Sequence, residues 1–170
     1  MKPDIKLFKR CMGKFATGVA IVTTLAPDNK KIGVTVNSLN SVSLDPFLIL
    51  FSLKRISHFY SYFIQSKHCT VNILSTKQSY LSRLFAKPLE ENWLEVETSQ
   101  DTITTSPAII GCITFLECEI YNQYDGGDHT IFIGKVVNLV EQNQDSPLLY
   151  FASEYRALDF NKKIDCTKKL

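Results

Sequence analysis

The chain reads Gly33-Val-Thr-Val-Asn-Ser-Leu-Asn-Ser-Val-Ser43 in its first half and Gly126-Gly127-Asp128-His129-Thr-Ile-Phe-Ile-Gly134 in its second. Each block places small, hydrogen-bonding residues beside an apolar segment of β-type, so backbone amides and hydroxyl groups can approach a ligand closely. Neither block fits a nucleoside triphosphate loop, a zinc site or a serine triad. Together they favour a flat, polar ligand held on a β-barrel.

Working outward from these blocks, the sequence predicts many strands and few helices. Asp4 is placed to cap a first helix, which we expect to end at Gly18. The apolar segment 47–53 predicts a strand buried on both faces. The other expected strands cover residues 19–25, from 32 onward, 69–74, 109–121, 130–140 and 148–151.

Two further helices and one long connection complete the prediction. Ser57 is placed to cap a short helix, and Ser75 with Gln78 has the spacing of a capping box. Residues 86–105 are polar and irregular, which indicates a long loop of the kind that often carries function. Strands and helices do not alternate regularly, so a barrel is favoured over a doubly wound sheet.

Composition bounds the class of protein. The 170 residues predict a single domain over 1–160, followed by a mobile tail over 161–170. A net charge of +2 without a basic stripe argues against nucleic-acid binding. The five cysteines lack metal-site spacing, so no metal is expected, and no segment has the features of a signal peptide or membrane span. A cytoplasmic location is the resulting expectation.

Three more motifs accompany the two blocks. They are Phe15-Ala-Thr-Gly18-Val-Ala-Ile-Val-Thr-Thr24, Val71-Asn72-Ile73-Leu74 followed by Gln78, Leu81 and Phe85, and Pro147-Leu-Leu-Tyr-Phe151 with Tyr155. In this order, over residues 7 to 158, the chain resembles the flavin-reductase-like family with the FMN-binding split barrel. The resemblance implies a β-rich α+β split barrel with a few flanking helices, and a homodimer. It also implies an NAD(P)H:flavin oxidoreductase that supplies reduced flavin to a monooxygenase.

An anion site is predicted where the central apolar strand ends. The stretch Ser52-Leu53-Lys54-Arg55-Ile-Ser57 places two cations before a capping serine, where helix amides favour a phosphate. The resemblance implies that this stretch lies against the flavin phosphate. A solvated basic turn with an ordinary helix cap is the alternative. Family members commonly have a threonine shortly after the serine, whereas this chain has His58.

The resemblance further implies that the isoalloxazine ring is lined by the first block. The residues concerned are Thr35, Val36, Asn37 and Ser38, with Ser41, Val42 and Ser43 completing the wall. Donors are needed there because reduction builds negative charge on the ring. The alternative is a loop at a strand end, where Asn37 and Asn40 bond their own backbone. Phe85 is a further candidate that could stack on flavin or nicotinamide, and the alternative is that its ring belongs to the core, as aromatic residues at such spacing more often do.

His129 is the candidate catalytic residue. It begins an apolar strand after a glycine turn, so an imidazole at the barrel rim is expected to orient the nicotinamide or stabilise charge on reduced flavin. The alternative is an exposed strand start, with Asp128 as a turn residue. The chain lacks a Gly-x-Gly-x-x-Gly motif after a strand, so NADH or NADPH is expected to bind across the flavin itself.

The sequence supports one principal hypothesis and one competitor. The hypothesis is hydride transfer from nicotinamide C4 to N5 of FMN or FAD, with reduced flavin passing to a partner monooxygenase. The competitor is a flavin carrier or electron-transfer module without NAD(P)H turnover, since fold does not decide function. The choices between FMN and FAD and between NADH and NADPH stay open, as does the choice between bound cofactor and dissociable flavin.

Overall fold

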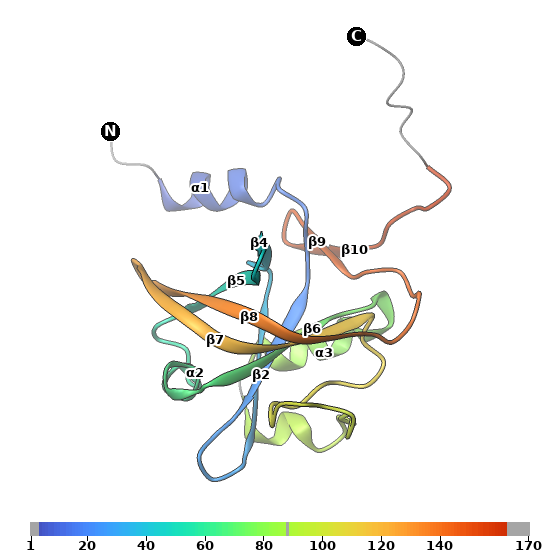
Figure 1. Cartoon of the computed structure of the whole chain (residues 1–170). Coiled ribbons are helices and arrows are strands. Elements are labelled where there is room, and N and C mark those ends of the chain that lie inside the picture. The colour runs from blue at the N-terminus through green and yellow to red at the C-terminus, as the bar shows by residue number, and fades with distance from the viewer. Residues whose placement is uncertain (1–3, 88, 163–170) are drawn as a thin grey trace.

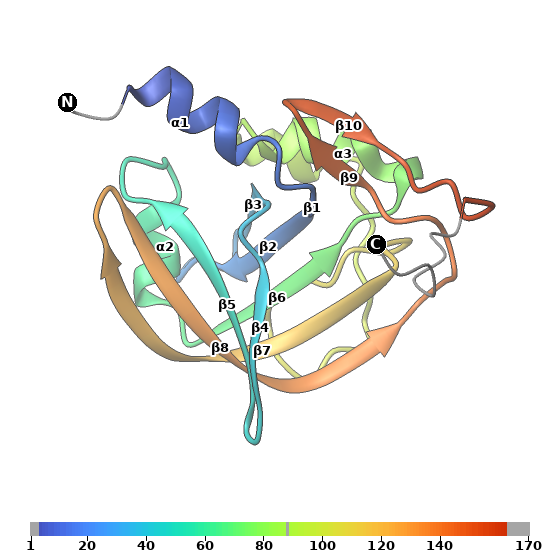
Figure 2. The same ribbon diagram turned by 90° about the horizontal axis from the view of Figure 1, so that it is seen from above.

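A computed structural model of the chain describes residues 4–87 and 89–162, and within them it shows two antiparallel sheets and three short α-helices (Figures 1 and 2). The larger sheet has the order β3-β2-β6-β7-β8-β5-β4, and the smaller has the order β1-β9-β10. The prediction of a β-rich α+β fold with few helices is confirmed. The predicted tail lies outside the described residues from position 163 onward.

The strands of the larger sheet are β2 (Ala20–Leu25), β3 (Lys31–Val36), β4 (Asn40–Leu44), β5 (Phe47–Lys54), β6 (His68–Ile73), β7 (Thr114–Gly126) and β8 (His129–Glu141). The smaller sheet consists of β1 (Thr17–Gly18), β9 (Leu149–Phe151) and β10 (Glu154–Arg156). The helices are α1 (Ile5–Met12), α2 (Tyr60–Gln65) and α3 (Ser79–Phe85), with 3-10 turns at Thr76–Gln78 and Glu90–Trp93.

The main core lies on the concave face of the larger sheet. Phe51 of β5 stacks on Phe132 of β8 with ring centroids 5.1 Å apart, and Phe63 of α2 meets Phe132 edge-on. The three rings are fully buried, so they anchor α2 against the central strands. The long β7–β8 hairpin turns at Gly127, whose φ of 76° suits glycine.

The prediction that segment 47–53 is buried on both faces is wrong. In β5 the side chains of Ile49, Phe51 and Leu53 are buried, whereas Leu48 and Leu50 are only half-buried. The reason is that β5 pairs with β8 and β4 in an antiparallel sheet with only one face on the core.

Hydrogen bonds of Ser38 connect the end of β3 to β5. Strands β3 and β4 are the edge strands, and Ser38 follows the end of β3. Its hydroxyl accepts a bond from the backbone N–H of Ser52 in β5 (2.9 Å) and lies 3.4 Å from the Ser52 carbonyl. A side-chain contact therefore links the residue after the edge strand β3 to β5, the neighbour of the other edge strand.

The N-terminal helix begins as predicted but ends earlier. The Asp4 carboxylate accepts bonds from the N–H groups of Lys6 and Leu7, which confirms the cap. The helix ends at Met12 and not at Gly18, which pairs with Leu149 in the smaller sheet instead. No residue of α1 is buried, and α1 lies at the periphery in both views (Figures 1 and 2).

The predicted cap of the second helix is wrong. Residues 55–59 form a turn, and α2 begins at Tyr60 with Phe59 at its cap position and no side-chain cap bond. Burial of the Phe59 ring, only 2% exposed, sets where this helix starts. At the third helix, the Ser75 N–H does bond the Gln78 side chain (3.3 Å), but a 3-10 turn precedes α3.

Segment 103–110 covers the outer face of the larger sheet through its backbone. The carbonyl of Pro107 accepts a bond from Thr23, that of Ser106 accepts one from Thr70 (3.1 Å), and the Ile109 N–H donates to Asn72 (2.7 Å). These contacts explain why Ile109 is not in β7, which begins at Thr114 and not at the predicted position 109.

The Glu117 carboxylate fixes the other end of this cover. Glu117 is fully buried and accepts bonds from the Ile103 N–H (3.1 Å), from the Thr104 N–H and hydroxyl (2.7 Å each) and from the Asn138 amide (2.8 Å). Burial by itself raises the pKa of Glu117, but the bonds from Asn138, Thr104 and Ile103 outweigh it, so the pKa lies below the ordinary value.

Candidate functional site

Three adjoining concavities form a band beside the end of β3. The central recess, about 200 Å³, is bounded by the end of β3, by α3 and by two tyrosines of the smaller sheet. The α1 hollow, about 690 Å³, shares Asn37 and Tyr150 with this recess. The α3 hollow, about 750 Å³, shares Ala86 and Tyr155 with it. The recess therefore lies between the two hollows and shares wall residues with both.

The predicted ring-lining residues of β3 do not all present side chains to the recess. Thr35 donates its hydroxyl hydrogen to the carbonyl of Ser82 in α3 (2.8 Å), and Val36 is only 6% exposed within the core. The Asn37 side chain is exposed between the recess and the α1 hollow. Of these residues, Asn37 is the one whose side chain is free to bond a ligand, while Thr35 and Val36 offer backbone groups.

The predicted continuation of this wall lies elsewhere. Ser41, Val42 and Ser43 belong to the edge strand β4, which is irregularly paired at this point. Val42 is 48% exposed, and the Ser43 hydroxyl accepts a bond from the Asp45 N–H (3.2 Å). None of the three lines the recess or either hollow.

A second group of predicted residues meets at the tip of the β7–β8 hairpin. Lys54 faces His129 across the β5–β8 ladder, and the Arg55 N–H bonds the Asp128 carbonyl (3.0 Å). The Arg55 guanidinium lies 2.9 Å from the Asp125 carboxylate, and His129 Nδ1 lies 2.7 Å from Asp128 Oδ1. We call Lys54, Arg55, Asp125, Asp128 and His129 the hairpin cluster.

The charges in the hairpin cluster largely neutralise one another. The bond to Asp125 raises the pKa of Arg55. The Gly127 N–H and then Arg55 lower the pKa of Asp125, and the bond from His129 lowers that of Asp128. Both carboxylates are therefore ionised at neutral pH. His129 Nε2 has no bond within the described part of the chain, which leaves this nitrogen available to a ligand.

The hairpin cluster and the recess are connected through Ser38 and Ser52. Ser38 follows Asn37 of the recess and bonds Ser52, and Lys54 lies two residues further along β5. Two residues of a strand span roughly 7 Å. The structure thus places Ser38 of the first block, the end of β5 and His129 near one another in the larger sheet.

Three predicted contact residues have different surroundings from those expected. Phe85 is 1% exposed and packs edge-on against Trp93, with ring centroids 4.8 Å apart, so its ring is a core side chain. Leu53 is 3% exposed and also faces the core. The Ser57 N–H bonds the Lys54 carbonyl in a turn rather than opening a helix. The predicted helix N-terminus for a phosphate is therefore absent at Ser57.

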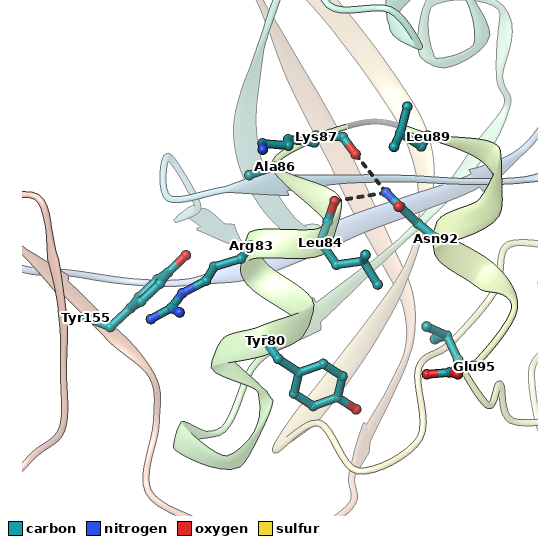
Figure 3. Close-up of a pocket in the computed structure, with 10 residues that line it drawn as sticks. Tyr80, Arg83, Leu84, Ala86, Lys87, Leu89, Asn92, Glu95 and Tyr155 are labelled. Carbon is teal, nitrogen blue, oxygen red and sulfur yellow. Dashed lines mark hydrogen bonds between the residues drawn. The ribbon is translucent and has the colours of Figure 1, made fainter.

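Sequence reasoning included Tyr155 in a family motif but missed Arg83 and Lys87, which also line the band (Figure 3). Tyr155 bonds Ser82 through its hydroxyl (2.8 Å), and the Arg83 guanidinium lies 5.4 Å from the centre of its ring. Arg83 and Lys87 both line the α3 hollow. The signal in the sequence was their four-residue spacing next to Tyr80 and Leu84, an amphipathic pattern that does not face the core.

The structure is a β-rich fold with a row of three concavities beside the end of β3. Comparison with known proteins identifies the family to which such a fold belongs. Residues 12–159 match the flavin reductase like domain. The chain belongs to this family, which confirms the resemblance predicted from the sequence and, with it, the flavin reductase class of enzyme.

Individual relatives support the same class. The chain is 37% identical over 134 residues to the reductase component of the flavin-dependent trigonelline monooxygenase of Acinetobacter baylyi, covering 79% of this chain but only 43% of that protein. It is 35% identical over 144 residues to the FMN reductase (NADH) SmoA of Agrobacterium fabrum, covering 84% and 80%. Nitrilotriacetate monooxygenase component B from Mycobacterium thermoresistibile has a similar structure, with a TM-score of 0.88, 30% identity and coverage of 96% and 92%.

Two further observations concern the described residues. No helix among them is both long enough and apolar enough to cross a membrane. No three His, Cys, Asp or Glu side chains within residues 4–87 and 89–162 are grouped as metal ligands would be.

Proposed function

We propose that the protein transfers hydride from NADH or NADPH to FMN or FAD, with the flavin held along the central recess. The observation that supports this most directly is that the recess shares lining residues with a hollow on each side. When bound, the flavin accepts the hydride and carries the redox chemistry itself. The protein's part is to bind, orient and stabilise charge.

The residues present in the band fit such a cofactor. Asn37 offers an exposed amide, and Tyr150 offers an aromatic surface at the junction with the α1 hollow. The hydroxyl of Thr17, which lines the same hollow, is buried and has no hydrogen-bond partner within the described chain. A buried hydroxyl without a partner is costly, and a bound polar ligand would remove that cost.

His129 and Lys54 are proposed to stabilise negative charge on the reduced cofactor. They are cross-strand neighbours at the end of β5, and Asp128 orients the imidazole by its bond to Nδ1. This arrangement leaves Nε2 to donate or accept a proton at the ligand. The role assigned to His129 is thus orientation and charge stabilisation, without a covalent step.

The same proposal includes a homodimer on a split barrel. Helix α1 has no buried residue, and Phe8 (62%), Met12 (54%) and nearby Phe15 (67%) are exposed. Exposed apolar area of this kind is typical of an interface. The Ser38–Ser52 bonds support barrel closure. A Phe8→Ser and Met12→Ser variant should sediment as a monomer if α1 is covered by a second copy; unchanged sedimentation of a dimer would place the interface elsewhere.

Reduced flavin is proposed to serve a partner monooxygenase, as the name of the Acinetobacter baylyi relative says of that protein. A reducing, cytoplasmic compartment belongs to the proposal because four described cysteines are free thiols: Cys11, Cys69, Cys112 and Cys118.

Anaerobic reduction tests the proposal directly. Excess FMN or FAD is mixed with the protein and then with NADH or NADPH, while the visible band of oxidised flavin is followed. Catalytic bleaching of many flavins per protein is expected. A band that shifts on binding but stays oxidised with both nicotinamides would instead establish the competing function, a flavin carrier without NAD(P)H turnover.

A further inference from the structure

Two buried cysteines lie opposite each other on the neighbouring strands β6 and β7 of the larger sheet (Figures 1 and 2). Cys69 is paired with Cys118 in the antiparallel ladder. Opposed residues point to the same face of a sheet, and both side chains lie in the main core with no exposed surface. The Cα atoms of opposed residues are roughly 4.5–5.5 Å apart. A disulfide requires about 4.4–6.8 Å, so the backbone of this pair already suits one.

The two thiols are in contact, and the core around them is tightly packed. A hydrogen bond with Cys118, together with burial, raises the pKa of Cys69 well above its ordinary value. On the side of β8, a Cβ at Gly134 would come within 3.1 Å of the Cys118 Cβ and 3.4 Å of its Sγ. The lack of a side chain at Gly134 therefore leaves room for the Cys118 thiol. A bond between the two sulfurs would replace a contact that the fold already has.

The other cysteines lack such a partner. Cys112 is buried in a separate small cluster, and burial raises the pKa of its thiol to about 12. Cys11 is exposed on α1, and Cys166 lies outside the described residues. Within the described part of the chain, Cys69 and Cys118 are thus the one pair of cysteines opposed across a ladder.

A hollow at one end of the sheet lies close to Cys69. It has a volume of about 360 Å³ and is bounded by the β2–β3 turn, the end of α2 and the start of β6. Its wall residue Thr24 shares a face of β2 with the core residue Val22, because residues two apart along a strand point the same way. The Thr24 hydroxyl bonds the Ser66 hydroxyl and the carbonyl of His68, which directly precedes Cys69. Cys69 is the second residue of β6, so fraying of this strand end brings it to the hollow.

We propose that Cys69 and Cys118 form a redox site, which hydrogen peroxide converts to a disulfide across β6 and β7. One thiolate attacks a peroxide oxygen, the O–O bond breaks, and a sulfenic acid and hydroxide result. The second thiol then displaces water from the sulfenic acid. Two thiols and one peroxide thus give one disulfide and two waters, and two electrons pass from sulfur to oxygen.

The peroxide has a source in the chemistry of the enzyme class. Reduced flavin that reacts with dioxygen, instead of serving a monooxygenase, returns to oxidised flavin and yields hydrogen peroxide. The inference rests on the proposed function only for this source. Because the pair is buried, the reaction with peroxide is expected to be slow and to follow local opening of the strand end.

The disulfide would restrain the centre of the fold. It closes the chain between positions 69 and 118, a stretch that contains α3 and the covering segment 103–110. A cross-link that closes a long loop limits the freedom of the unfolded chain. The oxidised protein is therefore expected to unfold at a higher urea concentration than the reduced protein.

Oxidation of a Cys11→Ser, Cys166→Ser variant tests the site without altering the core. Three of the five cysteines remain in this variant. The folded protein is treated with a small excess of hydrogen peroxide, which catalase then removes. It is unfolded in urea and alkylated with iodoacetamide, and its peptides are mapped by mass spectrometry. Three alkylated cysteines are expected before oxidation, and only Cys112 afterwards. The linked peptides of Cys69 and Cys118 should together be about 2 Da lighter than the two reduced peptides.

The oxidised variant should also show a higher urea midpoint, and dithiothreitol should reverse both changes. Three alkylated cysteines after oxidation would overturn the inference. A disulfide that includes Cys112, or a sulfinic or sulfonic acid at Cys69 in place of the disulfide, would overturn it as well.

Two matched controls use the same background. Cys118→Ser removes the partner, so Cys69 should form no disulfide within the chain, and a Cys69–Cys112 disulfide would contradict the assigned pairing. Cys112→Ser should still give the Cys69–Cys118 disulfide, and its failure to do so while folded would count against the site. Circular dichroism checks folding. If Cys118→Ser does not fold, the Cys112→Ser control and the parent variant still decide the question.

Aerobic turnover tests the source of the peroxide separately. NADH or NADPH with flavin should produce the same disulfide without added peroxide, and catalase should prevent it. A disulfide that forms with added peroxide but not during turnover would overturn the assigned source. A disulfide with added peroxide in a protein that does not reduce flavin would contradict the proposed function and leave the redox site standing.

Discussion

The hairpin cluster and the α3 hollow each contain two cations near the candidate site, but they differ in what faces them. In the hairpin cluster Arg55 is paired with Asp125, and Asp128 lies beside His129 and Lys54. In the α3 hollow Arg83 lies over the Tyr155 ring, and neither Arg83 nor Lys87 forms an ion pair with a described residue, although Glu95 lines the same hollow. A basic sequence motif therefore does not identify an anion site, because the site depends on which charges the fold has already neutralised.

The largest expected effect is that of His129→Ala, which should change the rate of flavin reduction and leave ligand affinity nearly unchanged. Loss of the imidazole is expected to lower the anaerobic rate of flavin reduction by about tenfold to a hundredfold, because charge on the reduced ring loses a stabilising group. Flavin affinity should be nearly unchanged, because the central recess is intact. Stopped-flow reduction and equilibrium binding measure the two quantities. An unchanged rate would remove His129 from the mechanism.

Gly33→Ala and Gly127→Ala test the supports of the two regions. A Cβ at Gly33 would lie 2.8 Å from the Phe85 ring, so overpacking behind α3 should lower the free energy of unfolding by about 1–3 kcal/mol. A Cβ at Gly127 meets no atom within 4 Å, and only its φ of 76° opposes alanine, at about 1–2 kcal/mol. Gly127→Ala should slow reduction more than it weakens FAD.

Urea unfolding measures both changes, with Gly18→Ala as the control, since nothing lies within 4 Å of a Cβ there. A Gly33 variant as stable as the Gly18 control would show that α3 can shift away from β3 without cost.

Acidification should affect the hairpin cluster and spare the cations of the hollow. The pKa values of Asp125 and Asp128 are depressed below the ordinary 3.8. Their contribution to stability is therefore present above pH 3.8 and is lost as the pH falls through the lower folded values. Side-chain NMR signals of Arg55 should then move, whereas those of Arg83 should not. Equal movement of both would indicate general unfolding.

Protonation of Glu117 should lower the stability of the whole fold on acidification. Its depressed pKa means that its contribution is present above the ordinary 4.5 and is lost as the pH falls through the folded value. Glu117→Gln should therefore lose less stability than the wild type between pH 5 and 3 on acid titration, as measured by urea midpoints. A parallel decline of the two proteins would assign acid sensitivity to other carboxylates.

Asp125→Asn should give the smallest effect. The change frees Arg55 from its ion-pair partner, so inorganic phosphate is expected to bind the hairpin cluster a few-fold more tightly, with a dependence on salt. Phosphate titration followed by NMR measures this at the Arg55 and Arg83 signals separately. Tighter phosphate binding only at Arg83 would be inconsistent with the neutralised state assigned to the hairpin cluster.

Local patterns in the sequence were sufficient to predict much of the fold. The Asp4 cap, the strand at 19–25 and the glycine turn before His129 depend on neighbouring residues, and the structure has all three. The early end of α1 and the late start of α2 could not be predicted in this way. Each depends on a distant partner, the strand around Leu149 for Gly18 and the core for Phe59.

The candidate site was predictable where residues act through strand position. The juxtaposition of Lys54 and His129 follows from two apolar strands that end at the same level. The inward direction of Phe85 and the pairing of Arg55 with Asp125 depend on packing between segments far apart in the chain. Arg83 and Lys87 were missed because a cation on a short helix has no distinctive motif unless the hollow beside it is known.

Segment 103–110 and the strand residues that it contacts on the outer face of the larger sheet should tolerate mutation to different degrees. The strands contribute side chains to these hydrogen bonds, namely those of Thr23, Thr70, Asn72 and Glu117. Segment 103–110 contributes mainly main-chain N–H and C=O groups. Almost any residue supplies the same N–H and C=O groups, so the covering segment is free to drift in sequence. The four strand positions are not. Relatives should therefore vary in the cover while keeping its polar supports, and a library randomised over 103–106 should yield many folded members.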